Sequence, residues 1–323
     1  MKTAAILMSM GGPASLEGVR PFLFNLFKDP AILRLPFFIR IPLAFYLARR
    51  REKAAIENYK KLGGSSPLLA NTKAQAAALE KELSKRGAFR CFVGMRYAPP
   101  FIDEMMAEVK KYAPDRLVFL PLYPQFSTTT TASALREAQK EAKRCGFLEE
   151  PITEVLSFHT DAGFIEAMAQ KVEHVFDEAK RHGNPKVIFT AHGLPLSVVR
   201  AGDPYPQQCA ETMAAILAAW KGDPPHDPAL AYQSRVGRAA WQSPTTSDTV
   251  LMAAREKRPI ILVPISFVSE HVETLVELEQ EAVALGIDAG SPFARVVPTV
   301  GTDALFIKGL AALIVKNTEK TRK

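Results

Sequence analysis

A series of glutamates near the C-terminal end of the chain has the type and spacing to do chemistry. Downstream of the apolar run Ile260–Val263, Glu273, Glu277 and Glu281 recur every four residues. This spacing places the three carboxylates on one face of a helix, with Glu270 expected one turn earlier. The pattern allows two interpretations, a solvated acidic face or a track of carboxylates that carries a divalent cation or protons.

Two histidines, His192 and His271, differ from the other four because each follows a buried apolar run. Neutral imidazole is basic near pH 7 and also binds borderline metal cations. A structural role suffices for either histidine alone, but both at matching edges of one domain favour a shared site. The carboxylate track would lead to His271 and Glu273 and, across the cleft, to His192. One imidazole with one carboxylate makes a weak metal site, which suits a metal that is passed on rather than kept.

These side chains must be positioned by the elements that precede them. Short apolar runs alternate with longer amphipathic stretches along the whole chain, which is typical of parallel strands joined by helices. Buried strands are expected at Ala4–Met8, Phe89–Gly94, Leu117–Leu122, Val187–Ala191, Leu230–Gln233 and Ile260–Val263. Helices are expected between them, at Lys73–Arg86, Ile102–Tyr112, Ala132–Cys145, Phe164–Arg181, Pro206–Trp220 and Val272–Leu285.

The two halves of the chain resemble each other. Ala5–Pro13 has the form of Val187–Pro195, and Leu117–Pro124 has the form of Ile260–Ile265. The sequence therefore predicts an α/β protein of two similar Rossmann-like domains, each a parallel sheet flanked by helices, at 1–154 and 155–323. We expect the last helix to pack back on the first domain, and the active site to lie in the cleft between the domains, beyond the carboxyl ends of the strands.

The positive charge of the protein is concentrated in one stretch. Between Arg20 and Lys61 ten basic residues face three acidic ones, an excess equal to the net charge of +7 of the whole chain. The overlapping segment Pro21–Arg51 holds seven of the 28 aromatic residues. Basic residues confined to one aromatic-rich stretch argue against a nucleic-acid partner and predict a ligand that is both anionic and apolar.

The segment 21–51 allows two structural interpretations. It is either a set of helices packed on the sheet or a hydrophobic lip with a basic border, Arg49–Arg51, that contacts a membrane surface. Three prolines, Pro30, Pro36 and Pro42, exclude a single long core helix. No apolar run approaches the roughly 20 residues that span a bilayer.

The cysteines predict no disulfide framework and no zinc ribbon, because the three of them are far apart and form no C-x-x-C pair. Reduced thiols favour a cytoplasmic location. With 47% hydrophobic and 23% charged residues, the chain has the composition of an ordinary globular protein rather than a disordered one.

Eight segments together resemble the ferrochelatases, the enzymes that insert Fe(II) into a porphyrin to make haem. In the order of that family, the segments are Met10–Pro13, Tyr59–Pro67, Gly94–Tyr97, Leu122–Phe126, Ala191–Pro195, Gly202–Pro206, Tyr232–Gly237 with Trp241, and Pro264–Leu275. Each segment is weak evidence alone, but their ordered sum is specific. The resemblance implies protohaem synthesis from protoporphyrin IX and Fe(II), with release of two protons, as the terminal step of haem biosynthesis.

The resemblance also implies the role of each site residue. His192 and Glu273 would be the catalytic pair, on the two sides of the macrocycle, and the ligands of the metal. His271 would lie behind them, with Glu270, Glu277 and Glu281 as the acidic track. The substrate-binding positions would be Met10, Arg51, Tyr59, Ser66, Arg96, Tyr97, Trp241 and Phe267, of which Arg51, Tyr59 and Ser66 match positions that hold propionates.

The chain departs from the family in two places. Tyr232 stands where the family often has Trp or Phe, and the last eleven residues, LIVKNTEKTRK, lack the cysteines that hold an iron–sulfur cluster in some relatives. We therefore expect no iron–sulfur cluster and no permanently bound cofactor, with Fe(II) acting as a substrate. The aromatic lip resembles that of relatives that use protoporphyrin IX at a membrane, which implies a cytoplasmic protein peripheral to the inner face of the membrane.

Two alternatives remain open from the sequence. One is a chelatase of the same fold that acts on another tetrapyrrole or metal, such as coproporphyrin or cobalt. The other is a non-catalytic porphyrin carrier, which needs an apolar pocket but has no use for an acidic track. The sequence does not indicate the oligomeric state.

Overall fold

The computed structural model describes residues 1–234 and 239–320, and contacts divide the chain into two units. Unit 1 comprises Met1–Ser157 with the chain from Ile307 onward, and unit 2 comprises Phe158–Phe306. The sequence analysis placed the boundary after residue 154. The last helix, α11 (Ala304–Lys320), belongs to unit 1 from Ile307 onward.

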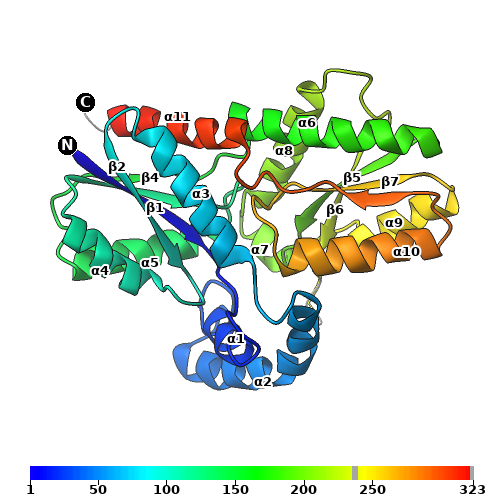
Figure 1. Ribbon diagram of the computed structural model, residues 1–323. Helices are drawn as coiled ribbons and strands as arrows, with labels where there is room; N and C mark the ends of the chain where they lie inside the picture. The colour runs from blue at the N-terminus through cyan, green and yellow to red at the C-terminus, as the bar shows by residue number, and fades with distance from the viewer. Residues whose placement is uncertain (235–238, 321–323) are drawn as a thin grey trace. The chain divides into compact units, whose positions relative to one another are not determined.

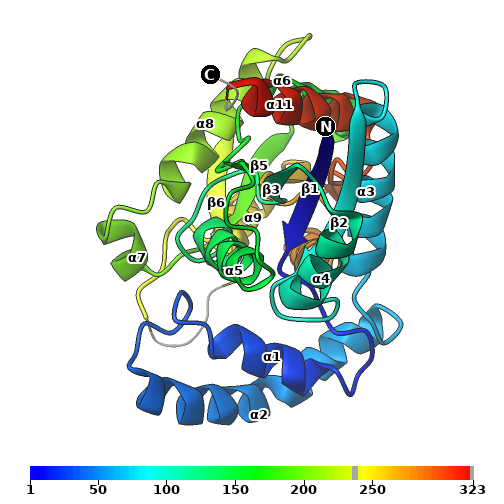
Figure 2. The ribbon, with the colours of Figure 1, turned by 90° about the vertical axis from the view of Figure 1, so that its left-hand side faces the viewer.

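Unit 1 is built on a parallel sheet of four strands in the order β2-β1-β3-β4. The strands are β1 (Lys2–Ser9), β2 (Ala88–Met95), β3 (Arg116–Pro121) and β4 (Ile152–Glu154). Besides α11, its helices are α1 (Val19–Phe27), α2 (Phe37–Lys61), α3 (Leu68–Leu83), α4 (Ile102–Tyr112) and α5 (Thr131–Arg144). Helices α4 and α5 lie on one face of the sheet and α3 lies on the other (Figures 1 and 2).

Strand β1 shows why both faces of this sheet are covered. Its side chains alternate between the two faces, so Ala4, Ile6 and Met8 join the core cluster of α4 and α5. Ala5 and Leu7 point the opposite way and are also completely buried. A strand buried on both faces reads as a continuous apolar run, which is the pattern from which the sequence predicted it.

The aromatic segment 21–51 forms α1 and the first part of α2, which lie beyond the carboxyl end of β1 (Figures 1 and 2). Pro30 and Pro36 fall in the break between the two helices, as expected. Pro42 does not interrupt α2, because the ring of a proline near the start of a helix disturbs only a carbonyl of the first turn, here the exposed Phe38. Pro30 and Pro36 therefore interrupt the segment, but Pro42 does not, since α2 continues through it.

Unit 2 contains a second parallel sheet, in the order β6-β5-β7-β8. The strands are β5 (Lys186–His192), β6 (Ala229–Gln233), β7 (Ile260–Pro264) and β8 (Ala294–Val296). The α-helices are α6 (Ala162–Ala179), α7 (Leu196–Arg200), α8 (Tyr205–Ala218), α9 (Thr246–Arg255) and α10 (Val283–Asp288), with a 3₁₀ turn at Lys180–His182. Core residues of α9 and of the helix before α10 pack on one face, and α6 and α8 lie on the other (Figure 1).

The two sheets confirm the predicted α/β fold of two similar domains. In each sheet, the strand that comes first in the sequence occupies the second position in space. Strand β1 of unit 1 therefore corresponds to β5 of unit 2, and β3 corresponds to β7. These are the strands whose ends resemble each other in the sequence.

The helix after β7 differs from the predicted α-helix at Val272–Leu285. From Glu273 to Ala282 it is a π-helix with hydrogen bonds from residue i to i+5, and it continues as α10. Glu270 precedes this helix, so the expectation that it lies one turn earlier on the same helical face was wrong. A π-helical stretch is rare and is found mostly at functional sites, which directs attention to Glu273 at its start.

Candidate functional site

The candidate site of unit 2 is built where three parallel strands end. The register pairs His192, the last residue of β5, with Gln233, the last residue of β6. Strand β7 ends beside them, since Pro264 pairs with Thr190. Because the carboxyl ends of parallel strands meet at one edge of a sheet, the loop after β7 returns Glu273 to the same place.

His192 and Glu273 are in direct contact, so the expectation that they lie on opposite sides of the macrocycle was wrong. The imidazole Nδ1 of His192 lies 2.8 Å from Oε2 of Glu273. About 37% of the His192 side chain is exposed, against 14% for Glu273. In the neutral imidazole a hydrogen on Nδ1, held by the carboxylate, leaves a lone pair on Nε2 that is free to take a proton or a metal cation.

The two groups perturb each other's ionisation. Burial acts to lower the pKa of His192, but the Glu273 carboxylate outweighs it, so the pKa lies above its ordinary value. Burial likewise acts to raise the pKa of Glu273, but His192 and then His271 hold that pKa well below its usual range. The pair therefore favours an ionised carboxylate beside an imidazole that accepts a proton readily.

His271 lies behind Glu273 and is almost completely buried. Its Nδ1 donates to the carbonyl oxygen of Ser269 at 3.2 Å, and its Nε2 lies 3.7 Å from Oε1 of Glu273. The ring of Phe267 packs on the imidazole, with centroids 4.5 Å apart. His271 thus orients the carboxylate from the side away from His192.

A second carboxylate, that of Glu277, is joined to Glu273 by Ser234. The Ser234 hydroxyl lies 2.5 Å from Oε2 of Glu277 and 3.2 Å from Oε2 of Glu273. Ser234 has a φ of 63°, a left-handed conformation that is uncommon for a residue with a side chain and often marks a functional site. Burial and the neighbouring Glu273 raise the pKa of Glu277 to about 7.

The other two acidic residues of the predicted track are placed differently. Glu270 accepts hydrogen bonds from the backbone N–H and the hydroxyl of Thr299, at 2.7 and 2.9 Å. With Glu279 it borders a hollow of about 570 Å³ between the π-helix and α6. Glu281 is exposed. The structure therefore brings Glu273 and Glu277 together with His192, and directs Glu270 elsewhere.

Trp241 forms an apolar wall beside His192. The two rings meet edge to face, with centroids 6.4 Å apart. The backbone of Trp241 forms an isolated antiparallel β-bridge with that of Pro195. The motif that precedes it, Tyr232–Gly237, is described only as far as Ser234.

The predicted substrate contacts of unit 1 gather at the end of β1. The Tyr97 N–H donates to the carbonyl of Met10 at 2.9 Å, and the Ser66 N–H donates to the carbonyl of Pro13 at 2.8 Å. A Cβ added to Gly12 would lie 2.5 Å from Ser66 and 3.8 Å from the Tyr59 hydroxyl. Met10, Tyr59, Ser66 and Tyr97 therefore surround one short stretch of chain. Arg51 lies about two turns before Tyr59 on α2.

Arg96 makes contacts that differ from those of its neighbours. Its guanidinium pairs with Asp29 at 2.9 Å and lies 3.6 Å from Glu137, and its Nε donates to the Ser133 hydroxyl at 3.0 Å. These partners favour a role in positioning the site over direct contact with a substrate.

The sequence model of the ferrochelatase family matches residues 2–318 of the chain. The chain belongs to the ferrochelatase family. The ferrochelatase of Caulobacter vibrioides is 44% identical over 317 residues, covering 97% of this chain and 89% of that protein. The ferrochelatase of the Wolbachia of Drosophila simulans is also 44% identical, covering 98% and 99%, and that of Trichodesmium erythraeum is 40% identical, covering 98% and 82%.

Two solved structures share the fold. SirB from Bacillus subtilis, determined with Fe³⁺, has a TM-score of 0.55 at 12% identity and covers 99% of this chain and 96% of its own. CbiX, described as the terminal enzyme of sirohaem biosynthesis in denitrifying bacteria, has a TM-score of 0.51 at 15% identity, covering 98% and 99%. At these identities the likeness supports the two-domain chelatase fold alone.

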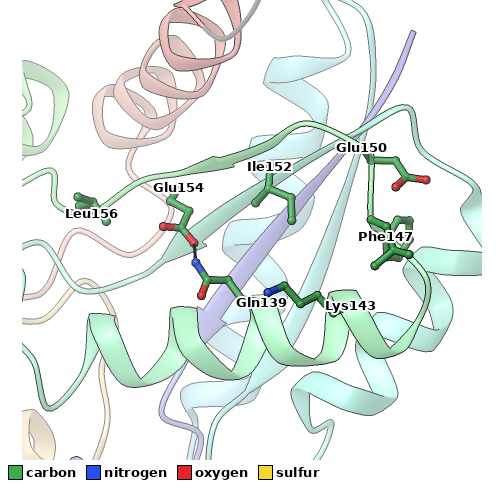
Figure 3. A pocket seen from close by; sticks show the side chains of 8 residues that line it. Gln139, Lys143, Phe147, Glu150, Ile152, Glu154 and Leu156 are labelled. Carbon is green, nitrogen blue, oxygen red and sulfur yellow. Dashed lines mark hydrogen bonds between the residues drawn. The ribbon is translucent and has the colours of Figure 1, made fainter.

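Unit 1 of this ferrochelatase-family chain contains a second hollow, distinct from the one that Glu270 borders. It has a volume of about 650 Å³ and is bordered by α5 and β4 of unit 1 (Figure 3). Gln139 and Glu154 close one side through a hydrogen bond of 2.6 Å, and Phe147 and Ile152 form an apolar wall. Among the described residues that line it, none is a predicted site residue, so we do not assign the family's chemistry to it.

Sequence reasoning missed Ser234 and Gln233. Gln233 accepts from the Thr190 hydroxyl at 2.9 Å and its amide lies 3.5 Å from Glu273. Both belong to the segment Tyr232–Gly237 that carried the family resemblance, so the signal was present but assigned no role. Among the described residues no group of three or more His, Cys, Asp or Glu side chains is arranged as a metal site.

Proposed function

We propose that this protein is a ferrochelatase that inserts Fe(II) into protoporphyrin IX, releasing the two pyrrole protons and yielding protohaem. The observation that carries the proposal is the 2.8 Å contact between Nδ1 of His192 and Glu273, in a chain that matches the family over nearly its whole length. A proton acceptor beside a buried carboxylate is what the exchange of two protons for one divalent cation requires.

His192 and Glu273 supply the base and the metal ligand. With its Nδ1 hydrogen directed at Glu273, the imidazole presents Nε2 to a pyrrole N–H or to Fe(II). The ionised Glu273 stabilises the imidazolium that forms on proton transfer. Glu277, with a pKa of about 7 and a hydrogen bond to the shared Ser234, is placed to take the proton onward.

The remaining predicted contacts bind the porphyrin itself. We assign apolar contact with the macrocycle to Met10, Tyr97, Trp241 and Phe267, and the propionates to Arg51, Tyr59 and Ser66, as the family resemblance implies. Apolar walls suit a flat aromatic ring, and a pocket that bends the ring exposes the nitrogen lone pairs and lowers the barrier to metalation.

A metalation assay tests the function. Purified protein with protoporphyrin IX and Fe(II) under reducing conditions, or Zn(II) in air, should shift the absorption bands of the porphyrin. His192→Ala should abolish turnover while porphyrin binding persists, and the exposed His226→Ala is the matched control. A wild type that leaves the bands unchanged refutes the proposal, and a His192→Ala variant that keeps most of its activity refutes the assigned role.

The same assay distinguishes the substrate from related ones. With protoporphyrin IX and coproporphyrin in competition, and Fe(II) or Co(II) as the metal, the ratio of kcat/KM values should favour protoporphyrin IX and Fe(II). A preference for coproporphyrin would keep the chelatase chemistry and correct the substrate. Loss of activity in Glu273→Gln would exclude a non-catalytic carrier.

We also propose that the protein binds anionic membranes peripherally, from the cytoplasmic side, through the first turns of α2. Phe37 and Phe38 are 69% and 74% exposed, and Phe45 and Tyr46, about two turns later, are more than half exposed. The exposed Arg49 and neighbouring cations border this apolar patch, which matches an anionic lipid surface. None of the described helices is long and apolar enough to cross a bilayer.

Vesicle sedimentation tests the membrane contact. Vesicles of phosphatidylcholine with an anionic lipid should bind the protein at low salt and release it at high salt. Phe37→Ser with Phe38→Ser should weaken binding, whereas Leu148→Ser, which changes a side chain 75% exposed elsewhere on unit 1, should not. Binding that is absent, or that both variants weaken equally, contradicts the proposal.

Finally, we propose that the protein works without a resident cofactor, so that iron is only a substrate. The three cysteines lie on different elements, and Cys209 is completely buried. Protein purified without added iron should show no visible absorption of an iron–sulfur cluster and should still metalate porphyrin with Zn(II). A visible band that is lost together with activity on chelation would refute this.

A further inference from the structure

The carboxylate of Asp29, between α1 and α2, is the most completely enclosed acidic group near the predicted porphyrin contacts of unit 1. Only 1% of its side chain is exposed. It accepts hydrogen bonds from the N–H of Ala31 at 2.8 Å, from the Tyr97 hydroxyl at 2.9 Å, and from the Ser133 hydroxyl. The guanidinium of Arg96 completes the set at 2.9 Å.

A buried carboxylate is costly unless hydrogen bonds and opposite charge compensate for its lost hydration. Burial acts to raise the pKa of Asp29, but the hydrogen bond from Ser133, the backbone N–H and Arg96 outweigh it, and the pKa is lowered. The carboxylate is therefore ionised and holds four groups in fixed directions. Those groups come from three places, namely the chain after α1, the end of β2 and the start of α5.

The partner that matters for substrate is Tyr97. Its hydroxyl is held by Asp29, its N–H by the carbonyl of Met10, and its carbonyl by the Asn25 side chain of α1 at 3.0 Å. With both ends of the residue fixed, the ring of Tyr97 has one orientation. Asn25 and Asp29 both belong to the segment that leads into the exposed aromatics of α2, so the same contacts join Tyr97 to that segment.

We infer that Asp29 is a positioning residue that holds the Tyr97 ring, of which only 4% is exposed, in the wall of the porphyrin site and ties it to the segment carrying α1 and α2. Asp29 acts through Tyr97 and Arg96 and takes no part in proton transfer or metal binding. The inference rests on the proposed function, in that Tyr97 is taken as a porphyrin contact.

The experiment is a steady-state comparison of Asp29→Asn with wild type, using Zn(II) and protoporphyrin IX, together with a fluorescence titration of porphyrin binding. Asparagine keeps the shape of the side chain but loses its charge. Its amide NH2 group would also face groups that donate hydrogen bonds to the carboxylate of Asp29. The KM and Kd for porphyrin should rise roughly tenfold, as loss of a charge-assisted hydrogen bond produces. The kcat at saturating porphyrin and the KM for Zn(II) should stay within about twofold.

Two further variants separate positioning from general stability. Tyr97→Phe removes only the hydroxyl and should raise the porphyrin Kd in the same direction, and the double variant should be no worse than Asp29→Asn alone, because both changes break one interaction. Glu141→Gln is the matched control. Glu141 is a carboxylate of α5 that is 2% exposed and paired with Lys140 and Arg144, so its change should lower thermal stability without moving the porphyrin Kd.

The possible outcomes are distinct. An unchanged porphyrin Kd in Asp29→Asn, additive effects in the double variant, or a fall in kcat at constant Kd each overturn the inference. If Asp29→Asn does not fold, Tyr97→Phe and Ser133→Ala, which each leave the carboxylate three partners, must raise the Kd instead. A wild type that binds porphyrin but does not metalate it refutes the proposed function, while the titrations still decide the role of Asp29.

Discussion

The pairing of Glu277 with Glu273 makes a quantitative prediction about stability and pH. Burial and then the Glu273 charge raise the pKa of Glu277 from its ordinary value of 4.5 to about 7. Between these values the folded protein keeps a proton that the unfolded chain has lost, so the stability contributed by Glu277 falls as pH rises through this window. At 1.36 kcal/mol per pH unit, the whole fall amounts to about 3 kcal/mol.

Glu277→Gln removes the titration and keeps the shape of the side chain. The free energy of unfolding of wild type minus that of Glu277→Gln should therefore decrease by about 2.5 kcal/mol between pH 5 and pH 8, because part of the whole fall occurs below pH 5. Urea denaturation with a metal chelator present measures it, because the only two tryptophans, Trp220 and Trp241, both belong to unit 2 and report its unfolding by fluorescence.

Ser234→Ala provides an internal check on the cause. The Ser234 hydroxyl donates to Glu277 and acts to lower its pKa, so its removal should extend the fall in stability to higher pH. If the difference between wild type and Glu277→Gln stays flat from pH 5 to pH 8, Glu277 does not hold a proton at neutral pH, and its assignment as the onward proton acceptor fails.

Two further predictions concern single sites of each unit. Gly12→Ala places a Cβ 2.5 Å from Ser66 and should displace that residue. The free energy of unfolding should fall by about 1–3 kcal/mol, measured by denaturation, and the porphyrin Kd should rise, measured by titration. Gly222→Ala is the control, because its added Cβ would have no atom nearer than 3.8 Å, and it should change neither quantity. Asp227 accepts two hydrogen bonds of 2.7 Å from Arg258, which with Lys186 hold its pKa below the ordinary value. Asp227→Asn should lower the free energy of unfolding by about 1 kcal/mol, since the carboxylate is half exposed. The difference between wild type and variant, followed by tryptophan fluorescence, should persist from pH 7 to pH 4 and shrink only in stronger acid. A difference already lost at pH 5 would contradict this.

The interior strands could be predicted from the sequence because each is buried on both faces. Ile260–Pro264, for example, has no exposed residue and reads as an unbroken apolar run. Two edge strands, Ile152–Glu154 and Ala294–Val296, were missed, since each has three residues and a polar or charged side chain that is not buried. The longer edge strands β2 and β6 were predicted. A strand of that length is recognisable only once its neighbour is in place.

The site was predictable in its chemistry but not in its connections. His192 could be selected by its place after a buried run and Glu273 by its place in a series of glutamates at helical spacing, whereas their pairing came from the family resemblance. That Ser234 bridges two glutamates depends on a left-handed backbone at a residue other than glycine, which no pattern in the sequence indicates. Asp29 was overlooked because a single acidic residue in a basic stretch is expected to be solvated.

The correspondence of the two sheets explains how one fold supplies different groups. Strands β1 and β5 occupy the same position in the order β2-β1-β3-β4 and β6-β5-β7-β8. The end of β1 leads to Met10, whose carbonyl holds the buried Tyr97, whereas the end of β5 is His192, held by Glu273. Under the proposed function, the ends of corresponding strands present apolar contacts in one unit and a proton acceptor in the other. Because loops at the carboxyl ends of strands vary without disturbing the buried runs beneath them, such divergence leaves the core of each unit intact.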